Sequence, residues 1–247
     1  LSAVRKDAVT AELDFNPVTD ATHYVIRRES NDESSDAPSI KEFLTNVTHF
    51  IDRSIDSLHN YSYSVRAMMG DRSGQASESS SIQPVVELMD DRDPRVQYGP
   101  AFHNWEDADL FAGTEKYADL TVDSYSDNDA TARITFNGRG IEIYGLKSSE
   151  LGLAEVQIDG KKVGDLDFHT SGETEKSALI GRFTGLPDRE HLLTLTVKKE
   201  HLNRGNERSK ISIDYFKIYP GQGATVEKMD DRDPRIHYGS LFKDWSE

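Results

Sequence analysis

The stretch Ala130-Thr131-Ala132-Arg133-Ile134-Thr135-Phe136 alternates apolar and polar side chains at every position. A period of two is typical of a β-strand that buries one of its faces. Similar short runs recur along the chain, bounded by Gly, Asn, Asp, Pro and Ser, and no stretch of ten or more residues has a helical period. The pattern predicts an all-β protein made of antiparallel β-sandwiches. The other runs are residues 11–15, 24–27, 61–67, 141–144, 154–158, 193–197 and 211–216.

Two glycine-containing segments predict hairpin turns between such runs. Asn137-Gly138-Arg139-Gly140 separates the runs 130–136 and 141–144, and Asp159-Gly160 follows the run 154–158. Glycine favours a turn because it adopts positive φ without a steric penalty. We therefore expect the chain to reverse direction at both places.

The composition excludes several classes of partner and site. The 247 residues carry 29 Lys and Arg against 44 Asp and Glu, for a formal charge of −15. Such an acidic chain is not expected to bind nucleic acid or an anionic membrane surface. No apolar run approaches the roughly 18–20 residues that a membrane span needs, so no membrane insertion is expected. The absence of Cys excludes disulfides and thiolate zinc sites.

An internal repeat defines the domain organisation. Residues 86–99 recur almost unchanged at 226–239, and the match continues from Phe102 and Trp105 to Phe242 and Trp245. The separation is a domain length and not the period of a solenoid. A polar, serine-rich segment ending at Pro84 marks a further boundary. The sequence therefore predicts domains over 1–84 and 85–225, with 226–247 as the truncated start of a second copy.

The first domain is similar to a fibronectin type III domain. The resemblance is carried by residues 13–18, 21–27, 50–52 and 58–67. Leu58 followed by Tyr61 matches the tyrosine corner of such sandwiches, in which the tyrosine hydroxyl bonds to nearby backbone. Phe15 stands where the family usually has a core Trp. The resemblance implies a role as a spacer between other domains.

The second domain resembles the galactose-binding-like β-sandwich modules of large secreted bacterial glycoside hydrolases. The resemblance implies non-catalytic carbohydrate recognition beside other domains of the same polypeptide, in a secreted or cell-surface bacterial protein, in particular a Gram-positive one. The ordered series behind it is Asp90-Asp91-Arg92-Asp93-Pro94, Trp105, 130–141, 144–145, 154–160, 185–186, 191–195 and 213–216.

Three loops contain the residue types that sugars require. A sugar offers an apolar ring face that stacks on an aromatic side chain, and hydroxyls that bond to His, Asn or Arg. Residues 102–107, 168–173 and 200–208 combine such side chains, and 147–150 is a weaker fourth loop. We expect a site for galactose-type or N-acetylhexosamine-type glycans. The candidate residues are Phe102, His103, Trp105, His169, Asn203, Arg204, Asn206 and Arg208.

Five of these candidates also have a purely structural interpretation. Trp105 and Phe102 would then be core residues, His169 a solvated loop residue, and Arg204 and Arg208 partners of neighbouring acids. The sequence leaves these alternatives open.

The acidic opening of the second domain suggests a cation site. Clustered carboxylates are the ligands that Ca²⁺ prefers, and related sandwiches often hold a structural Ca²⁺ between their first and last strands. The alternative is that Arg92 and Arg95 neutralise the acids through salt bridges. The candidate ligands are Glu87, Asp90, Asp91, Asp93 and Asp214.

No motif in the chain predicts catalysis. Nothing resembles a nucleophile elbow, a phosphate-binding loop or an HExxH helix. The two sandwiches leave no room for a catalytic barrel of roughly 250 residues. We therefore expect a non-enzymatic fragment of a glycan-degrading enzyme. The alternative is a pair of purely structural or protein-interaction modules without a sugar site.

Overall fold

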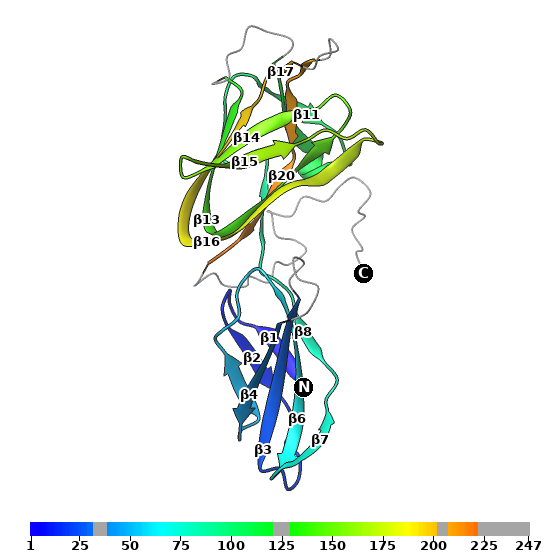
Figure 1. The fold of residues 1–247 in the computed structure, drawn as a ribbon, viewed down its shortest axis with the longest axis vertical. Helices are drawn as coiled ribbons and strands as arrows, with labels where there is room; N and C mark the ends of the chain where they lie inside the picture. Colours follow the sequence, from blue (N-terminus) through cyan, green and yellow to red (C-terminus); the bar gives the residue numbers. More distant parts are fainter. Residues whose placement is uncertain (32–38, 121–128, 202–206, 222–247) are drawn as a thin grey trace, which may run out of the picture. The chain divides into compact units, whose positions relative to one another are not determined.

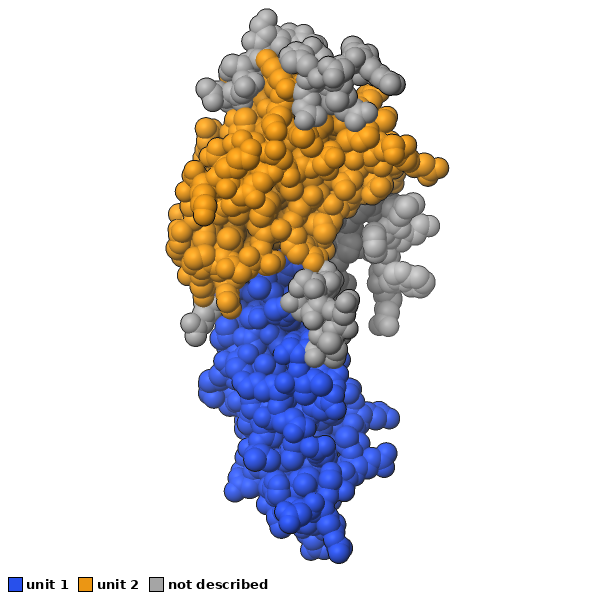
Figure 2. Space-filling view, in the orientation of Figure 1, with its two compact units in different colours: residues 1–86, 219–228 blue, residues 87–218, 229–247 orange. Residues whose placement is uncertain are grey.

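The computed structural model describes residues 1–31, 39–120, 129–201 and 207–221 (Figure 1). These residues confirm the all-β, antiparallel class, since apart from one 3₁₀ turn at Phe111–Gly113 their regular structure is β. Among them, no helix has the length and apolar character needed to cross a membrane. Two compact units, coloured separately in Figure 2, divide between Val86 and Glu87, two residues after the expected boundary. The expected second copy, 226–247, lies outside the described residues.

The first unit contains two antiparallel sheets. One has the strand order β1-β2-β5, and the other has the order β4-β3-β6-β7, with β8 also paired to β6. The strands are β1 (Ser2–Arg5), β2 (Ala11–Asp14), β3 (His23–Asn31), β4 (Ser39–Thr45), β5 (His49–Asp52), β6 (Asn60–Met69), β7 (Arg72–Ala76) and β8 (Ser80–Ile82).

The alternating pattern of these strands produces the core of the first unit. Leu13 of β2, Ile26 of β3 and Tyr63 of β6 are completely buried, as the period of two requires for one face of each sheet. Phe15 packs edge-on against Tyr24, with ring centroids 4.9 Å apart. Phe15 thus fills a place at the edge of this core.

The predicted tyrosine corner is present. The hydroxyl of Tyr61 accepts a hydrogen bond of 3.1 Å from the backbone N–H of Asp56. Tyr61 is 4% exposed, so the bond ties the 56–61 loop to the core at a site that excludes water.

A charged network is buried beside this core. The guanidinium of Arg28 lies 2.7 Å from Oδ2 of Asp52, and the hydroxyl of Tyr63 donates to the same oxygen at 3.0 Å. Burial works to raise the pKa of Asp52, but hydrogen bonds from Ser54 and Arg28 outweigh it and hold the pKa below its usual value. Asp52 is therefore buried in its ionised form, which depends on the hydrogen bonds from Ser54 and Arg28.

The second unit contains the larger core. Its main sheet has the order β15-β14-β16-β13-β20-β9, with β10 added to β13, and a smaller sheet has the order β11-β12-β19. A short hairpin, β17-β18, stands apart. The strands are β9 (Glu87–Asp90), β10 (Val96–Tyr98), β11 (Phe102–Glu106), β12 (Thr114–Asp119), β13 (Thr131–Lys147), β14 (Leu153–Ile158), β15 (Lys161–Asp167), β16 (Glu175–Val197), β17 (Glu200–His201), β18 (Glu207–Arg208), β19 (Lys210–Ile213) and β20 (Tyr215–Tyr219).

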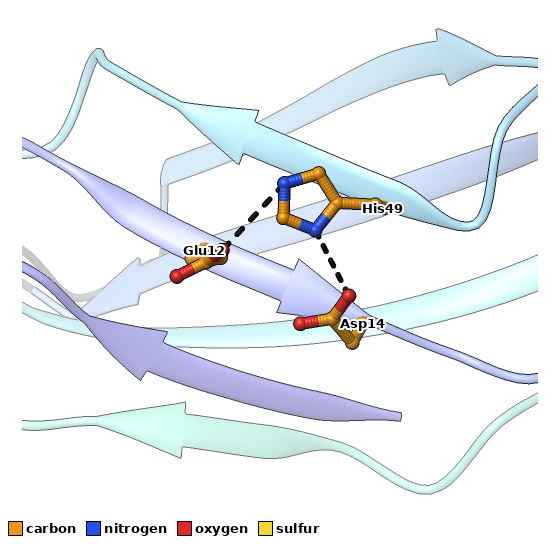
Figure 3. A group of neighbouring side chains, drawn as sticks. All are labelled: Glu12, Asp14 and His49. Carbon is orange, nitrogen blue, oxygen red and sulfur yellow. Dashed lines mark hydrogen bonds and ion pairs between the residues drawn. The ribbon is translucent and has the colours of Figure 1, made fainter.

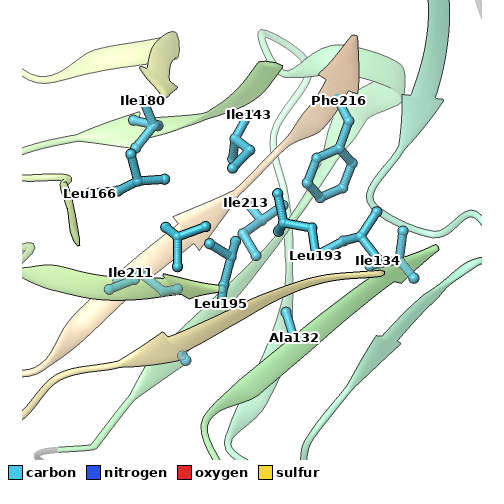
Figure 4. Close-up of a cluster of buried hydrophobic side chains, with 14 of the residues drawn as sticks. Ala132, Ile134, Ile143, Leu166, Ile180, Leu193, Leu195, Ile211, Ile213 and Phe216 are labelled. Carbon is cyan, nitrogen blue, oxygen red and sulfur yellow. The ribbon is translucent and has the colours of Figure 1, made fainter. Parts of the chain in front are cut away.

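Side chains from both of these sheets meet in one apolar cluster. The decisive stretch contributes Ala132, Ile134 and Phe136, each at most 1% exposed. Figure 4 shows residues of this cluster projecting from several strands, including Leu193 and Leu195 of β16 and Ile211 and Ile213 of β19. This core holds the rest of the unit in place.

One predicted hairpin is wrong and the other is correct. Residues 137–140 do not reverse the chain, because β13 runs continuously from Thr131 to Lys147 with a register shift between Gly138 and Gly140. A Cβ at Gly140 would lie 2.8 Å from the carbonyl oxygen of Phe183, so the glycine permits a close strand approach at this bulge. Asp159 and Gly160 both have positive φ and join β14 to β15 as predicted.

We predict that Asp52→Ala destabilises the first unit by about 3–5 kcal/mol, because it leaves the Arg28 guanidinium without its buried partner. Native-state hydrogen exchange of the β3 and β6 amides measures the change. Glu42→Ala is the control, since Glu42 forms an exposed pair with Arg66 that is worth less than about 1 kcal/mol. Equal effects of the two substitutions would contradict the structural role given to Asp52.

Candidate functional site

Strand β11 presents the exposed aromatic side chain that a sugar site requires. β11 pairs with β12 alone and so forms the edge of its sheet. Trp105 of this strand is 54% exposed, and His103 also faces solvent. The interpretation of Trp105 as a core anchor is therefore wrong, and its indole is available to a ligand.

Phe102, on the same strand, is buried. It is 9% exposed, lies opposite Ala118 in the register, and packs on Tyr98 with ring centroids 4.9 Å apart. A ring enclosed in the core cannot stack on a sugar. This corrects the expectation that Phe102 lines the glycan site and confirms its structural interpretation.

Further groups on β11 and β12 add polar and aromatic side chains to this strand pair. The imidazole of His103 lies against the ring of Tyr117, with centroids 5.5 Å apart. The ammonium group of Lys116 bonds to the side-chain oxygen of Asn104. The alternation of β11 places His103 on the same face as Trp105 and Asn104 on the opposite face, so of these groups the imidazole shares the side of the indole.

His169 is held by contacts between two loops of the second unit. It forms a β-bridge with Ser148, and its backbone N–H donates to Asp167 at 2.8 Å. The loops 147–150 and 168–170 are thereby joined, as the bonds between their backbones also show. Within the described residues, no hydrogen bond or ring contact links His169 to Trp105.

The third predicted loop contributes little to the described site. Asn203, Arg204 and Asn206 lie outside the described residues. Arg208 is placed in β18 by its backbone, and its side chain is not among those described.

Three buried carboxyl groups form a second candidate site. Asp91, Glu115 and Asp214 are 1%, 5% and 0% exposed. The backbone N–H of Asp91 donates to the carbonyl oxygen of Asp214 at 3.1 Å, which brings the two segments together. Among the described residues, no Lys or Arg forms an ion pair with any of the three carboxylates.

Neutral donors serve these carboxylates instead. The hydroxyl of Thr114 donates to Asp91 at 2.7 Å, and that of Ser212 donates to Glu115. Asp214 accepts the backbone N–H of Phe111 at 3.0 Å and the hydroxyl of Ser177. Nearly all the compensation for burial therefore comes from dipoles and not from opposite charge.

Electrostatics accordingly favour the protonated forms. Burial raises the pKa of Asp91 to about 6, although the Thr114 hydroxyl opposes the shift. Burial also raises the pKa of Asp214 to about 7, and the charges of Glu115 and Asp91 add to this effect. The pKa of Glu115 rises for the same reason, burial, against its bond from Ser212.

The remaining predicted metal ligands are engaged elsewhere. Arg95 pairs with Glu87 at 2.6 Å and with Asp93 at 2.8 Å, and Arg92 pairs with Asp90 at 2.8 Å. For these three acids the salt-bridge interpretation is correct. Only Oδ2 of Asp90 remains buried without a partner.

The sequence did not point to Glu115. Its strand, β12, was not recognised as one, and its burial depends on β19, which lies about a hundred residues further along the chain. A stack of Phe111, Tyr215 and Tyr144 was missed for the same reason, with neighbouring centroids 4.7 and 4.4 Å apart. No local pattern could have indicated either group.

Comparison with known proteins points to glycan-active enzymes. No protein-family model matches the chain. A stretch of 174 residues is 23% identical to the A type blood alpha-D-galactosamine galactosaminidase of Flavonifractor plautii, and covers 68% of this chain and 14% of that protein. The chain thus spans a small part of the length of the relative it matches.

Two solved structures illustrate the structural similarity. A two-fibronectin-type-III segment of chicken tenascin has a TM-score of 0.32 and 13% identity, over 85% of this chain and 93% of its own. A Paenibacillus xanthan lyase has a TM-score of 0.40 and 14% identity, over 86% of this chain and 19% of its own. Both TM-scores are below 0.5, so no argument rests on these overlays.

We predict that the second unit loses stability as pH rises from about 4 to about 7. A carboxyl whose pKa is raised by folding contributes stability that is fully present below the unfolded value and is lost as pH rises through the folded value. Asp214→Asn should flatten this dependence and add about 1–3 kcal/mol at pH 7.5.

Urea unfolding with a chelator present, followed by tryptophan fluorescence at pH 5 and 7.5, measures the effect. Glu150→Gln, at an exposed carboxyl of the same unit, is the control and should retain the wild-type slope. A wild-type protein more stable at pH 7.5 than at pH 5 would contradict the assignment.

Proposed function

We propose that the second unit is a non-catalytic glycan-binding module of a glycan-active enzyme and that the first unit is its spacer. The single observation behind this proposal is the indole of Trp105, 54% exposed on an edge strand beside polar side chains. The flat face of an exposed indole is the kind of surface on which an apolar sugar face stacks.

The distant relative supports the kind of glycan. Its name describes a galactosaminidase that acts on A-type blood alpha-D-galactosamine, a hexosamine. We propose galactose-type or N-acetylhexosamine-type glycans as ligands of this chain. The function implies a secreted or cell-surface location on a bacterium, in particular a Gram-positive one, because glycan polymers lie outside the cell.

The burial of three acids argues against their serving as catalytic carboxyl groups. Glycoside hydrolysis usually needs two carboxyl groups that reach the sugar from opposite sides. Asp91, Glu115 and Asp214 are at most 5% exposed and hydrogen-bonded to the protein itself, so they do not reach a ligand at the surface. We assign them to stability and not to chemistry.

Binding to a single module should be weak. One stacked sugar face and three or four hydroxyl bonds, each worth about 1 kcal/mol net, correspond to a Kd of about 0.1–1 mM. The repeat that begins at residue 226 supports an array of such modules. Several weak sites on one polypeptide would then hold it to a polyvalent glycan surface.

We predict that Trp105→Ala reduces glycan affinity at least about tenfold, or about 1.4 kcal/mol, without lowering the melting temperature of the second unit. The indole is exposed, so its removal leaves no core cavity. Calorimetric titration with the glycan measures binding to the wild type and to the variant, because it does not depend on the tryptophan that the variant lacks.

Leu192→Ala is the matched control, because Leu192 is an apolar residue of the same unit with 41% exposure and lies on β16. It should leave affinity unchanged. A folded protein that binds no glycan on a comprehensive array would favour the alternative of structural modules. Unchanged binding by Trp105→Ala would move the site away from β11.

We also propose that a Ca²⁺ ion compensates the buried acids of the second unit at neutral pH. Asp91 and Asp214, which the sequence nominated, and Glu115 supply oxygen donors of the kind that Ca²⁺ prefers. Asp90 adds a buried oxygen without a partner. The ligand types suit a hard cation, but the carboxylates of Asp91, Glu115 and Asp214 do not all lie within 4.8 Å of one another, so a bound ion would have to draw them together.

We predict that millimolar Ca²⁺ raises the melting temperature of the second unit at pH 7.5. At a hundredfold excess over Kd, the free energy of unfolding should increase by about 2.7 kcal/mol. The increase should shrink at pH 5, where protons neutralise the same carboxyls, and disappear in Asp214→Asn. Scanning calorimetry with Ca²⁺ and with chelator tests this. Equal melting temperatures with Ca²⁺ and with chelator at pH 7.5 would contradict the Ca²⁺ proposal and favour protonation of the buried acids instead.

A further inference from the structure

The first unit carries an imidazole between two carboxylates on the outer face of its smaller sheet (Figure 3). Ala11 and Leu13 of β2 are completely buried, so the alternating residues Glu12 and Asp14 project outward. His49 of β5 is the direct cross-strand partner of Asp14. Two paired strands therefore fix the positions of all three side chains.

The two nitrogens of this imidazole face different carboxylates. Nδ1 lies 2.9 Å from Oδ1 of Asp14, which is a hydrogen-bonding distance. Nε2 lies 3.6 Å from Oε1 of Glu12, which is too long for a hydrogen bond. In the neutral ring Asp14 selects the tautomer with the proton on Nδ1, because a carboxylate can only accept.

This tautomer leaves two electron pairs facing one another. The bare Nε2 and the Glu12 carboxylate are both acceptors, so a cation placed between them would stabilise the arrangement. A separation of 3.6 Å is close to that of two ligands of one tetrahedral metal ion, with bonds of about 2.0–2.2 Å each. A carboxylate on the other ring nitrogen is also the usual partner of a metal-bound histidine.

Among the described residues, Glu12, Asp14 and His49 are the one set of three such donors whose ligand atoms all lie within 4.8 Å of one another. Lys6 does not occupy the position, since its ammonium group contacts Oε2 of Glu12 at 2.8 Å, the oxygen that faces away from the imidazole. The donor set of one imidazole and carboxylate oxygens suits Zn²⁺ and related transition metals and not Ca²⁺.

We propose that the first unit binds a divalent transition metal such as Zn²⁺ between Nε2 of His49 and Oε1 of Glu12. Asp14 is the positioning residue that holds the ring through its Nδ1 proton, and water completes the coordination. The ion links β2 to β5 and thereby stabilises the sheet to which it binds. The site is independent of the glycan and calcium proposals, which concern the second unit.

The chain contains a matched control for this geometry. His59 also has Nδ1 at 2.9 Å from a carboxylate, that of Asp56, and belongs to the same unit. It belongs to no second set of three donors among the described residues. His59→Gln therefore removes a histidine–carboxylate pair without touching the proposed site.

Calorimetric titration of the full chain with Zn²⁺ at pH 7.5, with millimolar Ca²⁺ present throughout, tests the proposal. We expect one saturable Zn²⁺ equivalent whose affinity falls at least about tenfold in His49→Gln and in Glu12→Gln. Asp14→Asn should weaken it by about 10- to 100-fold, as expected for a partner of a metal-bound histidine. His59→Gln should bind as the wild type does.

Nitrogen NMR of the imidazole rings provides the second readout. Zn²⁺ should shift Nε2 of His49 while its Nδ1 remains protonated, a signature that a purely structural ion pair does not give. All four substitutions are outside the core, so circular dichroism should confirm unchanged folding. A wild-type protein that binds no Zn²⁺, binding that survives His49→Gln, or equal loss in His59→Gln would overturn the proposal.

Discussion

The antiparallel pairing of β13 with β16 is the constraint on which the second unit depends. The two strands run beside each other from the pair Thr131–Thr196 to the pair Lys147–Glu175, with bulges along the way. The inner face of this strand pair supplies much of the core. Its outer face carries the buried Glu142, whose Oε1 lies 2.6 Å from Nε of Arg182. β14 extends the sheet beyond β16, and β20 and β9 extend it beyond β13. The pairing is non-local, since β14 and β15 intervene in the chain.

This sheet order has an electrostatic consequence. Because β9 and β20 are neighbours, the turn after β9 brings Asp91 to Asp214, and β12 brings Glu115 into the same buried region. Ionised carboxylates that are buried close together repel one another, and hydrogen bonds from hydroxyl and amide donors offset only part of the free-energy cost of burying them. The region therefore requires protons or a cation. The proposed Ca²⁺ ion is one way to meet this requirement, and protonation of the same carboxyls is the other.

The two surfaces proposed to bind a ligand lie on an edge strand and on the outer face of a sheet. Trp105 extends from the edge strand β11, and the imidazole of His49 stands on the outer face of the β1-β2-β5 sheet. In both cases the opposite side of the strand is anchored in a core, by Phe102 in one and by Phe50 in the other. Rigid strands thus hold groups that could bind a ligand without reorganising, which limits the entropy lost on binding.

Local patterns determined much of this protein. The strand through residues 130–136 follows from its alternating pattern. The turn at Asp159-Gly160 follows from the tolerance of Asp and Gly for positive φ. The Tyr61 corner depends on one hydroxyl group that bonds to nearby backbone. Each depends on neighbours within a few residues, so the sequence alone was sufficient. The placement of Asp91 and Asp214 near the first and last strands was instead implied by the resemblance to related sandwiches.

Tertiary structure alone decided the rest. Phe102 and Trp105 stand three residues apart, so a period of two places them on opposite faces of β11, but which face is buried depends on how β12 and β19 cover it. The glycines at 138 and 140 are compatible with a turn or a bulge, and the close carbonyl of Phe183 selects the bulge. Glu115, Asp214 and the pair Asp14–His49 acquire their partners from segments that are distant in the chain. Contacts between residues so far apart in the chain leave no local periodicity, because they arise only when the strands pair.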